Sequence, residues 1–123
     1  MPDSFTDHRG TITDLLVTPL DAVTRITSVA GAVRGNHVHA ETTQWTLVLS
    51  GRLAIVTEKD GYRKRTEYGP GEMAIEAPGV PHAWLALTDC ECLVFTKGPR
   101  SGSAYESDTQ RLAKPLIEPG GRG

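Results

Sequence analysis

Short runs of β-forming residues, each closed by a turn signal, limit most strongly how this chain can fold. No segment repeats apolar residues at helical spacing over a useful length. Nine short strands in under a hundred residues predict an all-β sandwich or barrel. The predicted strands span residues 11–17, 23–30, 33–39, 44–49, 52–58, 62–68, 72–77, 82–87 and 90–96.

Turn residues support these boundaries. The run Lys59-Asp60-Gly61 predicts a hairpin turn, because glycine and, less readily, aspartate tolerate the positive φ that such turns require. Two proline-containing runs, 69–71 and 78–81, mark further breaks, since proline cannot donate a hydrogen bond to a strand ladder. The chain is therefore expected to turn sharply just before His82.

The character of the sequence changes after Gly98, where loop-forming residues surround a possible short helix beginning near Ser103. The segment 105–116 is expected either to fray into solvent or to pack on the barrel or on a partner subunit, since Tyr105 and three later aliphatic residues are apolar anchors. The length of 123 residues fits one domain, which we assign to residues 1–118. Residues 119–123 are expected to form a disordered tail.

The charge balance gives no general reason to expect a nucleic acid or a membrane as partner. Thirteen Lys and Arg residues stand against fifteen Asp and Glu, a net charge of −2, so any bound anion must be held by local groups. No apolar run approaches the roughly 20 residues of a membrane helix, and the run Met1-Pro-Asp-Ser lacks signal-peptide character. We therefore expect a cytoplasmic protein, with Cys90 and Cys92 as buried thiols.

Two histidines one residue apart form the centre of a candidate site. His37 and His39 lie in a predicted strand, where alternate side chains point to the same face. Gln44 begins the next strand, and His82 follows the break at 78–81. Together these residues offer three imidazoles and one amide oxygen, and we predict that the imidazoles gather in one pocket of the barrel.

The spacing of these residues resembles the two sequence motifs of the cupin family. Gln44 stands where the first motif usually has glutamate, and Ala77 and Ala86 replace the proline and asparagine of the second. The resemblance implies a single jelly-roll barrel, also called a double-stranded β-helix, with a short C-terminal tail. The matching positions are Gly31, His37, His39 and Gly51 in the first motif, and Gly71, Gly79 and His82 in the second.

Three further stretches look like dTDP-sugar 3,4-ketoisomerases and, more distantly, dTDP-4-dehydrorhamnose 3,5-epimerases. They are residues 7–10, 23–26 and 34–39, and the ketoisomerases also carry glutamine at the position of Gln44. This resemblance implies a keto-sugar nucleotide isomerase or epimerase that needs no cofactor. An imidazole suits the proton transfers because its ordinary pKa of about 6.5 lies near working pH.

The same resemblance suggests residue roles. His37 and His39 are the implied catalytic residues, with His37 at the position of the epimerase base. Arg9, Arg25 and Arg34 are the candidate substrate-binding residues, since a planar guanidinium matches phosphate oxygens. Arg9 is expected at a phosphate, and Arg34 at the sugar or the keto oxygen.

Two alternatives remain open. His37, His39, Gln44 and His82 are a suitable ligand set for Mn, Fe, Co, Ni, Cu or Zn, which predicts a metal-dependent dioxygenase or isomerase. A metal-bound imidazole cannot also transfer protons at the same nitrogen, so the two mechanisms exclude each other there. The second alternative is a barrel that binds a small molecule without catalysis.

Two features of the expected site and assembly depend on the fold. A carboxylate partner for the histidines is not evident; Glu41, Glu72, Glu76 and Asp14 are candidates. Small barrels of this kind protect their sheet edges by pairing. We expect a homodimer in which the N-terminal strand or the segment 98–116 reaches the neighbour.

Overall fold

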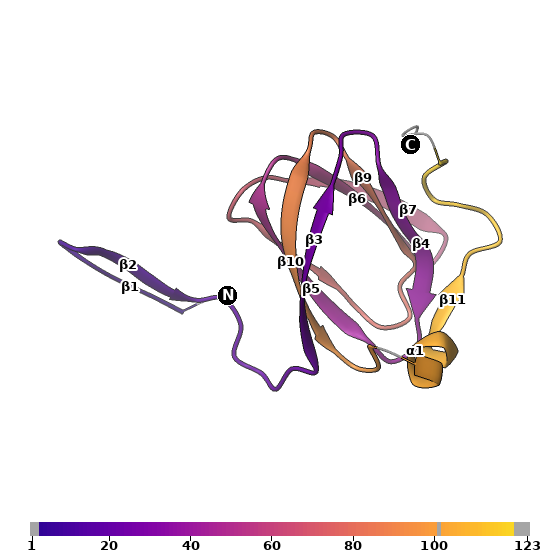
Figure 1. Cartoon of the computed structure of the whole chain (residues 1–123), viewed down its shortest axis with the longest axis horizontal. Helices are drawn as coiled ribbons and strands as arrows, with labels where there is room; N and C mark the ends of the chain where they lie inside the picture. Colours follow the sequence, from indigo (N-terminus) through magenta and orange to yellow (C-terminus); the bar gives the residue numbers. More distant parts are fainter. Residues whose placement is uncertain (1–2, 101, 120–123) are drawn as a thin grey trace.

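The computed structural model describes residues 3–100 and 102–119, which form a β-barrel of two antiparallel sheets (Figure 1). This confirms the predicted all-β jelly roll. The first sheet has the order β3-β10-β5-β8: β3 (Ala22–Ser28), β10 (Cys90–Lys97), β5 (Thr43–Ser50) and β8 (Met73–Glu76). The second has the order β11-β4-β9-β6-β7: β11 (Thr109–Arg111), β4 (Val33–His39), β9 (His82–Ala86), β6 (Leu53–Lys59) and β7 (Tyr62–Tyr68).

The predicted strands match the barrel closely. β4 and β7 have the predicted bounds, and the other predicted strands differ by one to three residues at an end. The turn at Asp60 and Gly61 joins β6 to β7 with both φ angles positive, at 54° and 76°. Two strands were not predicted, β1 (Asp3–Asp7) and β11, because both are mostly polar and lack an alternating apolar pattern.

The main core lies between the two sheets. Alternate residues of each strand point inward, and the buried set includes Val48, Leu53, Ile55, Trp84 and Val94. Cys90 and Cys92 belong to the same core as free thiols. Burial raises the pKa of the Cys92 thiol to about 12, so it stays protonated and inert.

A second apolar cluster lies on the outer face of the five-stranded sheet, where the C-terminal tail, residues 112–118, covers it. Leu112, Leu116 and Ile117 pack on outward-facing residues of β4, β6 and β9. Asn36 fixes this tail, because its amide oxygen accepts the Leu116 N–H at 2.8 Å and its amide nitrogen donates to the Ile117 carbonyl at 3.0 Å. Of the expectations for the segment up to residue 116, packing on its own barrel is the one observed.

One short helix, α1 (Gly102–Asp108), precedes β11 and begins within a residue of the predicted position. The described part of the chain contains no helix that is long and apolar enough to cross a membrane. Residues 120–123 of the predicted disordered tail lie outside the described residues.

The N-terminal residues form a separate two-stranded sheet. β1 pairs with β2 (Gly10–Asp14), and the hairpin projects away from the barrel (Figure 1). Its turn contains His8 and Arg9, at the end farthest from the barrel in that view. Residues 15–21 connect it to β3 without regular structure.

Candidate functional site

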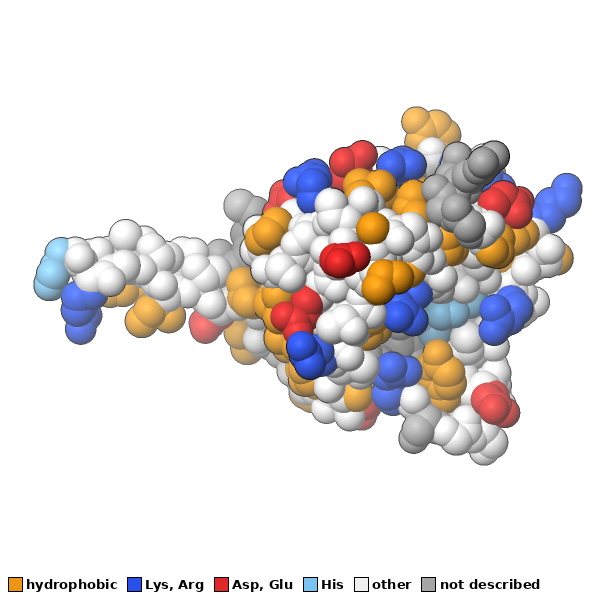
Figure 2. Space-filling model, turned by 45° about the horizontal axis from the view of Figure 1, so that its top comes forward, with side chains coloured by type: hydrophobic (Ala, Val, Ile, Leu, Met, Phe, Trp, Pro, Cys, Tyr) orange, Lys and Arg blue, Asp and Glu red, His pale blue; other side chains and the backbone are white. Residues whose placement is uncertain are grey.

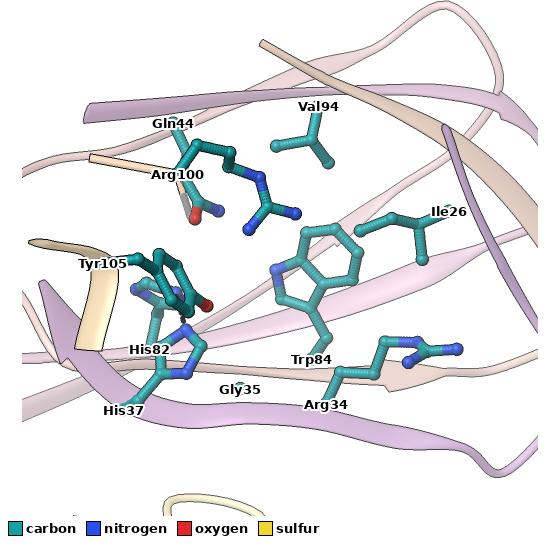
Figure 3. A pocket seen from close by; sticks show the side chains of 10 residues that line it. All are labelled: Ile26, Arg34, Gly35, His37, Gln44, His82, Trp84, Val94, Arg100 and Tyr105. Atoms are coloured by element: carbon teal, nitrogen blue, oxygen red, sulfur yellow. Dashed lines mark hydrogen bonds between the residues drawn. The ribbon is translucent and has the colours of Figure 1, made fainter. Parts of the chain in front are cut away.

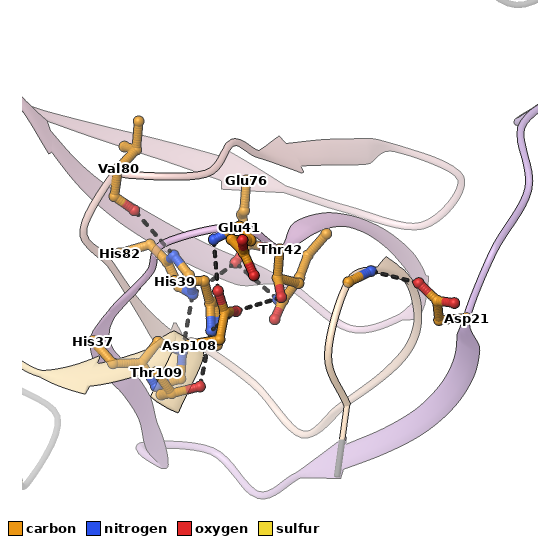
Figure 4. A network of polar contacts seen from close by, with 12 residues as sticks. Asp21, His37, His39, Glu41, Thr42, Glu76, Val80, His82, Asp108 and Thr109 are labelled. Carbon is orange, nitrogen blue, oxygen red and sulfur yellow. Dashed lines mark hydrogen bonds and ion pairs between the residues drawn. The ribbon is translucent and has the colours of Figure 1, made fainter. Parts of the chain in front are cut away.

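The three predicted histidines converge inside the barrel. His37 and His39 lie on the same face of β4, and the antiparallel pairing of β4 with β9 sets His82 opposite His37. The ring centre of His37 lies 4.5 Å from that of His39 and 4.7 Å from that of His82. One ring nitrogen from each histidine lies within 4.8 Å of the others (Figure 4).

A β-bulge in β4 determines which other residues face the histidines. The register of β4 against β9 shifts between Gly35 and His37, where Gly35 and Asn36 have φ angles of 83° and 57°. The bulge adds one residue to β4 and reverses the alternation. Arg34 therefore lies on the same face as His37, although three positions separate them.

A cavity of about 240 Å³ opens beside the histidines (Figure 3). One part of its wall is polar and carries imidazoles and an amide, and another part is apolar. The polar lining includes His37, His82, Gln44, Arg34, Arg100 and Tyr105, and the apolar lining includes Ile26, Trp84 and Val94. His39 does not belong to this lining; its ring is buried behind the other two.

The imidazoles facing the cavity are neutral at neutral pH. Burial, together with the neighbouring His82, His39 and Arg111, lowers the pKa of His37 to about 4. Burial also lowers the pKa of His82. The Nε2 atoms of His37 and His82 lie 3.1 Å apart, so one ring donates a hydrogen bond to the other, depending on the tautomer. A neutral, hydrogen-bonded imidazole pair can accept a proton and pass it on.

Glu76 is the carboxylate that meets this pair. It lies on β8 and is buried, and its carboxylate accepts hydrogen bonds from the Thr46 hydroxyl at 2.6 Å and the Trp84 indole at 3.3 Å. One of its oxygens lies 3.2 Å from His82 Nε2. Burial disfavours the ionised form and raises the pKa of Glu76 to about 7, although the hydrogen bonds from Thr46 and Trp84 oppose this shift.

The other three candidate acids do not reach the histidines. Glu72 accepts the backbone N–H of Gly69 at 2.6 Å, and Asp14 is exposed on the projecting hairpin. Glu41 is exposed, and its backbone N–H donates to Asp108.

Asp108 is a second buried carboxylate at the site, and it was not predicted. It is the last residue of α1 and accepts the Glu41 N–H at 2.6 Å and a hydrogen bond from the Thr42 hydroxyl. Its oxygen lies 3.6 Å from His39 Nδ1, which also contacts the Thr109 hydroxyl at 3.0 Å. These contacts fix the His39 ring, whose other nitrogen, Nε2, is buried without a hydrogen-bond partner among the described residues.

Of the three predicted arginines, only Arg34 lines the cavity. Its guanidinium donates to the Ser28 hydroxyl at 2.9 Å and to the Thr27 carbonyl at 3.0 Å. Arg25 is exposed on the outside of β3 and pairs with Glu91. Arg9 lies in the projecting hairpin and pairs with Asp7 at 2.7 Å. The structure therefore places Arg9 and Arg25 away from the cavity of their own chain.

Two residues of the cavity wall come from the segment after Gly98, for which the sequence predicted loop-forming residues around a possible short helix. The Arg100 guanidinium carbon lies 5.4 Å from the centre of the Tyr105 ring, a cation–π arrangement. The Tyr105 ring centre is 6.0 Å from that of His39. Tyr105 was predicted as an apolar anchor, but neither residue was predicted at the site, because they reach it only when the segment folds back beside β4.

The histidine cluster fits a divalent metal ion. Three imidazole nitrogens within 4.8 Å suit first-row transition metals, and the Nε2 of buried His39, which has no hydrogen-bond partner among the described residues, offers its lone pair when Nδ1 carries the proton. The Nδ1 atom of His82 faces the Val80 carbonyl at 3.3 Å, which favours the tautomer with Nε2 available as a ligand. Gln44 lines the same cavity and is the remaining predicted ligand.

Comparison with known proteins agrees with this architecture. A family model described as a cupin domain matches residues 25–96, more than half of the chain. No curated protein matches the chain.

Solved structures with the same fold include a ketoisomerase and two epimerases. The sugar 3,4-ketoisomerase QdtA from Thermoanaerobacterium thermosaccharolyticum, solved with TDP, is 22% identical with a TM-score of 0.73, over 91% of this chain and 85% of that one. RmlC epimerase from Mycobacterium tuberculosis is 16% identical with a TM-score of 0.70, over 89% and 65%. The dTDP-4-dehydrorhamnose 3,5-epimerase from Sulfolobus tokodaii is 19% identical with a TM-score of 0.64, over 88% and 72%. At these identities the likeness shows the fold alone.

Proposed function

The chain belongs to the cupin domain family, and from this premise we propose that it is an isomerase or epimerase of a keto-sugar nucleotide that uses histidine acid–base chemistry. The observation that carries the proposal is the cavity itself. It joins a neutral, hydrogen-bonded imidazole pair to two arginines, Arg34 and Arg100, for which the described residues provide no carboxylate partner. Such a cavity suits an anionic substrate that must lose and regain a proton.

The chemical step is proton removal beside a keto group. His37 takes the proton as a neutral base, and its hydrogen bond to His82 spreads the added positive charge over the two rings. Reprotonation at a neighbouring carbon or on the other face of the sugar gives the isomer or the epimer. The His39 ring lies outside the cavity lining, so we assign it to packing against His37 and not to contact with the substrate.

The anionic part of the substrate is assigned to the arginines at the cavity. With a net charge of −2, the chain as a whole does not attract a nucleoside diphosphate, so individual guanidinium groups must bind it. Arg34 and Arg100 are placed for this role, and Tyr105 supports Arg100 through its ring. Partners under this proposal are a nucleoside-diphosphate sugar and a second copy of the chain.

Structures of the same fold support the choice of substrate class. The ketoisomerase QdtA was solved with TDP, and a variant of it with TDP-4-keto-6-deoxyglucose. Those ligands belong to those proteins. They make TDP-linked keto-sugars the first compounds to test here.

A second candidate function is a metal-dependent enzyme. The unpartnered His39 Nε2 within a three-imidazole cluster favours it specifically. His37, His39 and His82 would hold the ion with Gln44 beside them. A bound ion would act as a Lewis acid on a substrate oxygen. The Val80 carbonyl, which faces His82 Nδ1, would then orient His82.

One experiment separates the candidate functions. Chelator-treated protein is assayed for turnover of a TDP-4-keto-6-deoxy-sugar by NMR, with His37→Asn as the test variant and His8→Asn as the control. His8 lies in the projecting hairpin, away from the cluster. We expect His37→Asn to lower turnover by roughly 10²–10⁴-fold, the usual contribution of general acid–base catalysis, and His8→Asn to leave it unchanged.

The other outcomes have distinct meanings. Chelated protein that is inert and regains activity with Mn or Fe supports the metal-dependent enzyme. TDP-sugar binding by calorimetry without product under either condition supports a binding module, the third interpretation of the sequence. Turnover that survives His37→Asn contradicts the proposed role of His37.

A further inference from the structure

Arg111 lies next to His37 across two paired strands, on the inner face of the five-stranded sheet. β11 pairs with β4 in a register that sets Thr109 opposite His39 and Arg111 opposite His37. Residues directly opposite each other in an antiparallel pair point to the same face, with Cβ atoms about 4.5–5.5 Å apart. The contact of 3.0 Å between the Thr109 hydroxyl and His39 Nδ1 shows this for the first pair. The Arg111 side chain therefore leaves the backbone on the same face as the His37 ring.

The charge of Arg111 acts on His37 and is otherwise unpaired in the part of the chain that the structure describes. Burial and the imidazoles of His82 and His39 contribute most to the low pKa of His37, and Arg111 is the one Lys or Arg that adds to them. Among residues 3–100 and 102–119, no carboxylate forms an ion pair with the Arg111 guanidinium. An unpaired guanidinium beside a neutral imidazole is available to bind an anion.

A second hollow meets the catalytic cavity at His37. It has a volume of about 350 Å³, and Arg34, Gly35 and His37 line both spaces. Arg111 lines the second hollow and not the first. Figure 2 shows a histidine surface on the barrel between groups of Lys and Arg side chains. A substrate held against His37 can therefore contact guanidinium groups from both spaces.

We propose that Arg111 is a further catalytic residue, whose guanidinium binds the keto oxygen of the substrate and stabilises the enolate that forms there. This role rests on the keto-sugar function proposed above. When His37 takes the proton, the C–H bond beside the carbonyl breaks, its electron pair forms a carbon–carbon double bond, and the carbonyl π electrons move to the oxygen. That oxygen carries the negative charge until a proton from His37 returns to carbon, which removes the charge on both groups.

The position of Arg111 suits this transient charge better than the positions of the other two arginines. The Arg34 guanidinium already donates to a hydroxyl and a carbonyl of β3, at 2.9 and 3.0 Å. Arg100 lies over the Tyr105 ring, 5.4 Å from its centre. We therefore leave Arg34 and Arg100 for the phosphates, whose charge is permanent, and assign to Arg111 the charge that appears beside His37. A guanidinium keeps its proton in proteins, so it stabilises an oxyanion without acting as a competing acid.

The test compares Arg111→Gln and Arg111→Lys with Arg65→Gln as control. Arg65 is also exposed and lies on β7, the opposite edge strand of the same sheet. Turnover of a TDP-4-keto-6-deoxy-sugar, and exchange of the proton beside its keto group in D₂O, are followed by NMR at saturating substrate. Exchange reports enolate formation. Calorimetry with TDP, which has no keto group, reports binding of the phosphates alone.

We expect Arg111→Gln to lower both turnover and exchange by roughly 10²–10³-fold, the usual cost of removing one oxyanion donor, and to leave the affinity for TDP unchanged. Arg111→Lys keeps the charge and should recover part of this loss. Arg65→Gln should change none of the three values. Circular dichroism checks that each variant retains the β-sheet spectrum of the unmodified chain.

The contrary results separate this role from the function on which it rests. Turnover and exchange that are as fast in Arg111→Gln as in the unmodified chain overturn the role of Arg111 and leave the proposed function standing. A lower affinity for TDP with unchanged turnover at saturation also overturns the role, because Arg111 would then bind the phosphates. An unmodified chain that neither converts the sugar nor exchanges its proton contradicts the proposed function, and the role of Arg111 with it.

A measurement on the unmodified protein keeps the proposal testable if a variant fails to fold. Phenylglyoxal modifies accessible arginine side chains, and mass spectrometry of the resulting peptides locates each modified residue. Arg111 should be protected by the TDP-4-keto-6-deoxy-sugar but not by TDP. Labelling of Arg111 that is the same with and without the sugar nucleotide overturns the proposal, and so does equal protection by TDP alone.

Discussion

At the scale of single residues, the site is organised by burial acting on ionisable groups in opposite directions. Burial lowers the pKa of His37 to about 4 and raises that of Glu76 to about 7. Both shifts favour the neutral form of the group, so the cluster carries little charge at neutral pH. This suits a site that must accept a proton from a weakly acidic carbon and bind an anion through arginines.

The Glu76 shift has a measurable effect on stability. In the unfolded chain this carboxyl titrates near 4.5, so between about 4.5 and 7 the folded protein binds more protons than the unfolded one. The free energy of unfolding therefore falls as pH rises through this window. Glutamine cannot ionise, so the Glu76→Gln variant lacks this loss. The free energy of unfolding of the variant minus that of the unmodified protein should therefore be larger at pH 8 than at pH 5, by up to roughly 3 kcal/mol. Urea unfolding at both pH values measures this difference.

The control for that measurement is Glu106→Gln, an exposed position on α1. Its stability relative to the unmodified protein should be the same at both pH values. An equal difference at pH 5 and pH 8 for Glu76→Gln would mean that Glu76 is ionised in the fold throughout, with a cation beside it.

At the scale of elements, β4 does most to build the site. Its bulge sets Arg34 on the same face as the histidines, and Asn36 of the same bulge binds the C-terminal tail. Glycine is needed at position 35, because φ is positive there and an added Cβ would lie 3.0 Å from the His82 carbonyl oxygen. The bulge therefore positions residues on both faces of the sheet: Arg34 at the cavity, and Asn36 at the C-terminal tail on the outer face.

The bulge can be tested with two matched glycine substitutions. Gly35→Ala should lower the free energy of unfolding by about 1–3 kcal/mol, because it adds a steric contact with β9 to an unfavourable φ. Gly61→Ala in the β6–β7 turn has a similar φ of 76° but open space around the new Cβ, so it should cost only about 1 kcal/mol. Denaturant midpoints compare the two, and equal costs would mean that β9 yields freely at position 35.

At the scale of the whole molecule, the C-terminal tail completes one outer face of the barrel. The tail closes the outside of the five-stranded sheet, where Ile117 is 1% exposed although it lies near the end of the chain. Six of the ten large hydrophobic residues that are exposed among the described residues lie between positions 5 and 23, in the projecting hairpin, the connection after it and the start of β3.

The contribution of the tail follows from the burial of Ile117. Ile117→Ala should lower the free energy of unfolding by about 2–5 kcal/mol, as for other large-to-small changes in a core. Val29→Ala, at a position 70% exposed, should change it by less than about 0.5 kcal/mol. Thermal or urea unfolding gives both values. A cost for Ile117→Ala as small as the control would show that the tail does not contribute to the stability of the barrel.

The sequence by itself determined the parts that depend on neighbours along the chain. The alternation of apolar residues and the turn residues gave most strands, and the period of two put His37 and His39 on one face. The motif spacing added His82 and Gln44. These are short-range patterns, because strand formation and turn geometry are decided within a few residues.

Only the tertiary structure decided which distant residues join the histidines. The bulge reversed the alternation at Arg34, and the return of the segment after Gly98 brought Arg100, Tyr105 and Asp108 to the site. It also separated Arg9 and Arg25 from the cavity. Such contacts join residues up to 70 positions apart, as between His39 and Thr109. They depend on how whole strands pack and on one extra residue in a strand, which no local pattern encodes.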